Sequence, residues 1–185
     1  VLFRSGFVDA PISGALEARL TQDGTFGGMT AELGLAAGRL APGDGARPIG
    51  FDRAALSLAY DPVTARIALS GLSVESPSLR LTAHGHGDLL ASDGSPLAAG
   101  ALPDSILAQI AVEEVMLDPD GLFEEPVRFG SGALDLRLQL SPFRLDIGQV
   151  ALVEDDERLL LSGAVEATDR GWNLALDVDL NRIET

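Results

Sequence analysis

Residues 134–140 read LDLRLQL, and residues 172–180 read WNLALDVDL. In both stretches apolar residues alternate with polar ones, so the apolar side chains are two positions apart. This is the period of a β-strand that has one apolar face and one polar face. The same alternation fills most of the chain and predicts a nearly all-β fold with little or no helix.

Outward from these stretches, the alternation and the turn signals between its segments predict about ten strands in antiparallel hairpins. Asp23-Gly24 and Asp61-Pro62 have the chemistry of tight turns, and Ser141-Pro142 interrupts the alternation. Residues 40–50 are rich in Gly and Pro and predict a loop. The predicted strands are 11–21, 29–35, 54–60, 66–69, 79–87, 106–117, 134–140, 143–147, 158–167 and 172–180.

The segment 106–117 is less regular than the others. Ile110 and Val112 share a parity that Val115 and Leu117 reverse, which predicts a β-bulge near Glu113-Glu114. Residues 103–108 could also begin a helix capped by Pro103 or Asp104. The alternating, β-branched residues that follow favour a strand.

The chain divides into four parts by composition. Residues 1–5, VLFRS, are what the end of a common sequencing-adapter primer encodes, so we expect the native sequence to begin near Gly6 within a longer reading frame; a genuine strand start is the alternative. Residues 6–90 form a first set of β-hairpins, and residues 104–185 form a second set. Residues 91–103, rich in Gly, Pro, Ser and Ala, are expected to link the two sets.

Composition excludes several classes of function. Of 185 residues, 46% are hydrophobic, which is too many for a disordered chain. Lys and Arg number 13 against 28 Asp and Glu, a net charge of -15, so nucleic acid is not an expected partner. Cysteine is absent, which excludes disulfides and thiolate zinc sites. No apolar run approaches the roughly 18 residues of a transmembrane helix, and no secretory signal is evident.

The apolar face of these strands must meet something apolar. A second sheet would give a β-sandwich with a closed core. Bilayer lipid would give an outer-membrane barrel, but such barrels carry aromatic girdles and this chain has 1 Trp and 1 Tyr. The third partner is a chain-like ligand in an open groove, which flexible, mostly Leu side chains suit.

Several short sequence segments resemble those of a known family. They are Phe129–Leu138 (FGSGALDLRL), Pro142–Val150 (PFRLDIGQV), Leu161–Val165 (LSGAV), Gly171–Leu174 (GWNL) and, in style, Tyr60–Pro62 and Leu79–Leu81. Together they resemble the AsmA-like proteins of Gram-negative bacteria, closest to the large YhdP/TamB-type branch with an AsmA-like C-terminal region. The likeness covers most of the chain after Ser5.

The resemblance implies an extended antiparallel sheet curled like a taco around an open apolar β-groove. It implies a periplasmic segment of an inner-membrane-anchored cell-envelope protein, with the anchor outside this chain, that moves phospholipid acyl chains towards the outer membrane. Partners would be phospholipid acyl chains and neighbouring groove segments of the same full-length chain. The candidate groove-lining residues are Leu16, Leu20, Met29, Leu33, Leu35, Leu56, Leu58, Ile67, Leu69, Leu79, Leu81, Leu134, Leu136, Leu138, Leu140, Phe143, Leu145, Ile147, Leu161, Val165, Trp172, Leu174, Leu176 and Val178.

Residues for catalysis are not apparent, and no catalytic residue, metal site or cofactor is expected. His84 and His86 share a strand face but lack a third ligand, so a solvent-facing pair is expected. The acidic stretches 118–125 and 154–157 are interpreted as solvated turns, with weak calcium binding as the alternative. No G-x-S-x-G elbow or phosphate loop occurs. The sequence therefore favours a lipid conduit, with a structural or adhesive β-sandwich module as the alternative; an enzyme would need a clustered polar pocket.

Overall fold

The computed structural model describes residues 2–4, 8–24, 26–40, 48–98, 100–118, 126–154, 157–168 and 171–182. Every regular element among them is a β-strand, so the prediction of an all-β chain is confirmed. No helix long and apolar enough to cross a bilayer occurs among these residues. The strands are β1 Leu2–Arg4, β2 Val8–Leu20, β3 Phe26–Leu35, β4 Gly38–Leu40, β5 Ile49–Phe51, β6 Arg53–Asp61, β7 Arg66–Glu75, β8 Leu79–Leu90, β9 Ser105–Leu117, β10 Val127–Phe129, β11 Ser131–Leu140, β12 Phe143–Glu154, β13 Glu157–Thr168 and β14 Gly171–Arg182.

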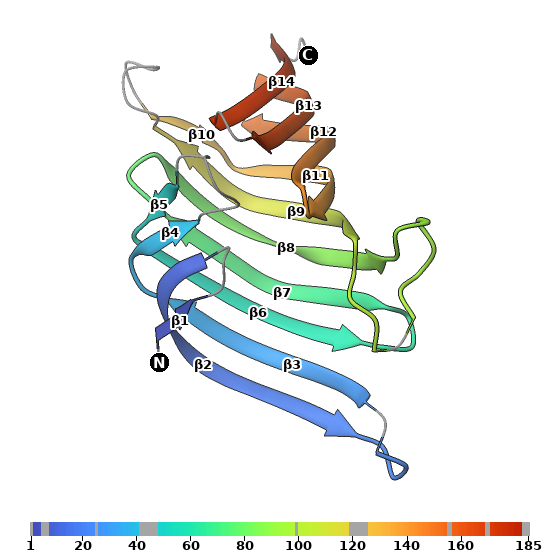
Figure 1. Cartoon of the computed structure of the whole chain (residues 1–185). Coiled ribbons are helices and arrows are strands. Elements are labelled where there is room, and N and C mark those ends of the chain that lie inside the picture. The colour runs from blue at the N-terminus through green and yellow to red at the C-terminus, as the bar shows by residue number, and fades with distance from the viewer. Residues whose placement is uncertain are drawn as a thin grey trace.

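All fourteen strands belong to one antiparallel sheet. Its order is β14-β13-β12-β11-β9-β8-β7-β6-β3-β2-β4-β5, with β1 paired to β2 and β10 paired to β9. Figure 1 shows the long strands β2, β3, β6, β7, β8 and β9 lying one above another, with β11 to β14 turned away from them by the twist of the sheet. The sheet does not close into a barrel, which confirms the prediction of a curled open sheet.

The register keeps one apolar face continuous across the sheet. Leu33 lies opposite Leu56, and Leu56 lies opposite Leu72, so apolar residues face apolar residues from strand to strand. Register shifts in β7, β9 and β12 insert extra residues without reversing this face. In β9 the shift leaves Glu113 with no residue opposite it in the register of β8. The bulge predicted near Glu113-Glu114 is therefore confirmed.

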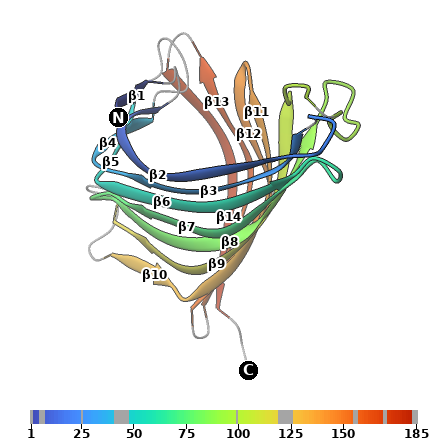
Figure 2. The same ribbon diagram turned by 90° about the horizontal axis from the view of Figure 1, so that it is seen from below.

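The sheet has one layer, and it is curved. The chain exposes 11786 Å², whereas a compact monomer of 19.3 kDa exposes about 8,500 Å². In a flat single-layer sheet the apolar side chains would stay open to water, but Val112, Val115 and Leu152 are only 4–5% exposed. The apolar face is therefore concave where these residues lie, and Figure 2 shows the strands bent into arcs.

Two details differ from the sequence-based expectation. Residues 40–50 were expected to be a loop, but Leu40 ends β4 and Ile49 and Gly50 begin β5, because the segments that flank the Gly- and Pro-rich stretch pair with each other. Between β8 and β9 the described residues 91–98 and 100–104 include one isolated bridge, which joins Leu90 and Pro96. The two strands, β8 and β9, pair directly along their length, so one sheet includes both sets of strands.

Candidate functional site: a concave apolar face

The register assigns all the predicted groove-lining residues to one face of the sheet, which we call the apolar face. Residues opposite each other in neighbouring strands share a face, so membership follows from strand to strand. The set comprises Leu16 and Leu20 of β2; Met29, Leu33 and Leu35 of β3; Leu56 and Leu58 of β6; Ile67 and Leu69 of β7; Leu79 and Leu81 of β8; Leu134, Leu136, Leu138 and Leu140 of β11; Phe143, Leu145 and Ile147 of β12; Leu161 and Val165 of β13; and Trp172, Leu174, Leu176 and Val178 of β14.

Sequence reasoning missed the contribution of β9 to this face. Ile110 lies opposite Leu134, and beyond the bulge Val115 lies opposite Leu81. The sequence contained the signal for this placement. The apolar residues change parity at Glu113-Glu114, and one extra residue there puts the residues before and after the bulge on the same face. Residues of the same face that the prediction also omitted include Tyr60, Leu72, Val74, Leu89, Ile106, Val112, Leu117, Val150, Leu152 and Leu159.

The centre of the apolar face packs into a cluster that spans β8 to β13. Its buried members are Ala83, Val112, Val115, Phe129, Val150 and Leu152. None of the large side chains that the structure describes is less than 2% exposed. A closed core of two packed sheets would bury several of them completely, so this packing is that of one curved sheet, with β10 against β12.

Several glycines allow neighbouring strands to approach closely on the apolar face, and Gly85 and Gly163 are two of them. A Cβ atom added to Gly85 would lie 2.2 Å from the carbonyl oxygen of Gln109, and one added to Gly163 would lie 2.0 Å from that of Ala175. Gly163 has a φ of 137°, a conformation that L-residues rarely adopt. Any side chain at either position would push the adjacent strand away, so these glycines help to set the curvature.

The two edges of the apolar face remain open to solvent. On β2, Leu16 and Leu20 are 60% and 70% exposed; on β14, Leu174 and Val178 are 58% and 61% exposed. No described strand pairs with the outer edge of β14, or with that of β2 beyond Pro11. The apolar surface therefore runs from exposed Leu residues at one edge, through a packed centre, to exposed Leu and Val residues at the other.

The opposite face is polar and carries ion pairs between adjacent strands. Arg66 Nε lies 2.6 Å from Asp88 Oδ1, and Arg53 Nη2 lies 2.7 Å from Glu75 Oε2. The side-chain hydrogen bond from Arg66 lowers the pKa of Asp88. In β12, Arg144 contacts both Asp146 and Glu166. These pairs are half-exposed, so they keep the outer face hydrated and add little to stability.

The two histidines lie on this polar face. His84 Nδ1 is 3.1 Å from Glu113 Oε1, and His86 lies opposite Gln109. No group of three His, Cys, Asp or Glu residues with the spacing of a metal site occurs in the described parts of the chain. The acidic turns at 118–125 and 154–157 fall mostly outside the described residues.

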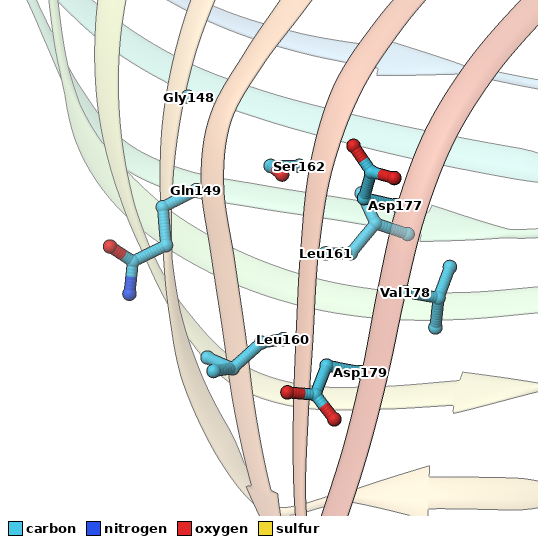
Figure 3. A pocket seen from close by; sticks show the side chains of 8 residues that line it. All are labelled: Gly148, Gln149, Leu160, Leu161, Ser162, Asp177, Val178 and Asp179. Atoms are coloured by element: carbon cyan, nitrogen blue, oxygen red, sulfur yellow. The ribbon is translucent and has the colours of Figure 1, made fainter.

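The polar face also has hollows. One of about 410 Å³ lies over β12, β13 and β14, where Gln149, Ser162, Asp177 and Asp179 surround it (Figure 3). Another, of about 400 Å³, lies over β2, β3 and β6 and includes Glu17, Thr30 and Ser57. Both are shallow, and both are lined by hydroxyl and carboxylate side chains.

The arrangement offers binding by apolar contact. A concave strip of Leu, Val and Ile side chains removes apolar groups from water without fixing their orientation. Comparison of the chain with family models, curated proteins and solved structures gave no match.

Proposed function

We propose that this chain is a segment of an AsmA-like cell-envelope protein whose concave apolar face carries phospholipid acyl chains. The single observation that carries the proposal is the continuity of the apolar face across the sheet, from β2 to β14, combined with a single-layer architecture. Each methylene group moved from water to such a surface gains about 0.8 kcal/mol. The face thus favours long acyl chains and needs no contact with the headgroup.

The polar face supports the same role. Its ion pairs, in a chain with 28 Asp and Glu against 13 Lys and Arg, hold one side of the sheet in water while the other side accepts lipid. Periplasmic location and an inner-membrane anchor elsewhere in the full-length protein belong to this proposal. The alternative, a structural or adhesive β-sandwich, needs a second sheet over the apolar face, and the described strands form one sheet.

A phospholipid with a photoreactive diazirine in its acyl chain tests the proposal. We expect adducts on apolar-face residues such as Leu56 and Leu136, and none on Leu107, an apolar residue of the polar face that is 44% exposed. Adducts spread equally over both faces would contradict the proposal.

Variants sharpen this experiment. The double substitution Leu16→Asp and Leu174→Asp places charges at the two exposed edges of the apolar face, and we expect it to weaken lipid binding about tenfold, or 1.4 kcal/mol. Leu107→Asp is the control on the opposite face, because it replaces an exposed leucine by one carboxylate on the polar face. Equal binding by all three proteins would show that the apolar face does not hold the lipid.

A further inference from the structure

The antiparallel order places the strand ends along two rims of the sheet. One, which we call the turn rim, carries the connections 21–24, 62–65, 91–104 and 141–142. For β2 to β9 it is the right-hand side of Figure 1. The opposite rim carries 36–37 and 76–78 and lies beside β4 and β5. The two rims bound the same apolar face, so side chains exposed at one rim alone point to a contact made by that rim.

Phe51 and Phe129 lie at the opposite rim, whereas the amphipathic aromatic residues lie near the turn rim. The chain has one Tyr and one Trp, and both lie there: Tyr60 is the penultimate residue of β6, and Trp172 is the second residue of β14. Tyr60 stacks with Phe26 at a centroid distance of 6.0 Å, and Trp172 meets Phe143 edge-on at 5.7 Å. Amphipathic aromatic rings of this kind concentrate where proteins meet the headgroup region of a bilayer.

Apolar side chains also project from the turns of this rim. Val63 is 91% exposed and Leu102 is 92% exposed; Leu20 and Phe26, which flank the turn between β2 and β3, are 70% and 42% exposed. On the opposite rim, Ile49 at 52% is the one comparable side chain among the described residues. Because Val63 and Leu102 stand on separate turns, they do not form the flat contiguous patch of a protein interface, but they can enter a fluid surface independently.

The charge at the turn rim determines which kind of lipid surface the rim can approach. Asp61 accepts hydrogen bonds from the Val63 backbone N–H at 2.8 Å and the Thr64 hydroxyl at 2.9 Å, and Asp93 accepts them from Ser95. These bonds lower the pKa of both carboxyls, so the turns carry negative charge at neutral pH. Anionic lipid would repel them, whereas lipids with zwitterionic headgroups would not.

We propose that the turn rim docks on the surface of a zwitterionic phospholipid bilayer, with Val63 and Leu102 entering the interface and Tyr60 and Trp172 lying at headgroup level. Docking at this rim would place the apolar face beside the source of its lipid. The proposal goes beyond acyl-chain transport, because the rim could dock even if the apolar face held no ligand.

Flotation of the whole chain with phosphatidylcholine–phosphatidylethanolamine vesicles tests it. We expect the double variant Val63→Asp, Leu102→Asp to lose about tenfold in vesicle affinity, while the control Ile49→Asp on the opposite rim binds like the wild type. Both substituted turn residues are more than 90% exposed, so the fold should tolerate them. Adding phosphatidylglycerol should weaken binding of the wild type.

Three results would overturn the docking proposal: no flotation of the wild type, equal flotation of the double variant and the wild type, or stronger binding to anionic vesicles. Photo-crosslinking to the diazirine phospholipid in detergent micelles separates this proposal from the proposed function. If docking alone is correct, crosslinking fails while flotation persists and depends on Val63 and Leu102. If transport alone is correct, crosslinking persists without flotation.

Discussion

The centre of the apolar face and its edges are built from the same kinds of side chain, yet water reaches them very differently. Leu152 in β12 is 5% exposed, whereas Leu16 in β2 and Leu174 in β14 are 60% and 58% exposed. All three point to the same side of one sheet. Burial here depends on curvature and on neighbours to both sides, so the centre stabilises the fold and the edges leave apolar surface available to a ligand.

The largest effect is expected from truncating the centre. Phe129→Ala removes a ring that is 3% exposed within the central cluster and should lower the free energy of unfolding by about 3–5 kcal/mol. Leu174→Ala at the edge should cost less than about 1 kcal/mol. Urea unfolding of both variants measures the difference, and equal costs would mean that the edges are as well packed as the centre.

A smaller loss of stability is expected when a glycine of the apolar face is replaced by alanine. Gly85→Ala should cost about 2–3 kcal/mol, because its Cβ would overlap the Gln109 carbonyl between two central strands. Gly163→Ala makes a similar overlap in the edge hairpin, where β14 can move away, and should cost about 1–2 kcal/mol.

Gly71→Ala is the matched control for these glycine variants. The nearest atom to its added Cβ is 4.0 Å away, so its stability should stay within about 1 kcal/mol of the wild type. Hydrogen exchange should show faster opening of β13 and β14 in the Gly163 variant alone. Protection of β14 unchanged by Gly163→Ala would contradict the role assigned to that glycine.

The smallest expected effect is on the pH dependence of stability, through an ion pair of the polar face. Arg66 lowers the pKa of Asp88 below its ordinary value of 3.8, so the ionised carboxylate stabilises the fold above that value. This contribution is lost as the pH falls through the depressed pKa. Asp88→Asn should therefore lower the urea midpoint slightly at pH 7, and the difference from the wild type should shrink towards pH 3. A difference that grows on acidification would show that the Arg66 pair does not act in this way.

The sequence predicted the local parts of this structure well. Alternation located the long strands and the shared face of residues such as Leu136 and Leu176, because side-chain direction is a property of the single strand. The parity change in β9 predicted its bulge. The short strands β1, β4, β5 and β10 are absent from the ten predicted strands, since three residues carry too little pattern to distinguish a strand from a loop.

The arrangement of strands in space could not be predicted from alternation. Whether Leu58 or Leu134 meets a second sheet or stays in a single layer depends on the path of the chain between strands, and the same residues suit both. Curvature was hidden for a related reason: Gly85 and Gly163 suggest close approach of the backbone, but the partner strands that they approach are set by long-range register.

Native mass spectrometry with lipid extraction, on the chain purified from a bacterial envelope in mild detergent, tests the central claim most directly. The account predicts phospholipid bound at a defined stoichiometry and displaced by excess fatty acid, because the apolar face accepts acyl chains without recognising the headgroup. A lipid-free mass from a folded protein that unfolds cooperatively would contradict it and would assign the apolar face a purely structural role.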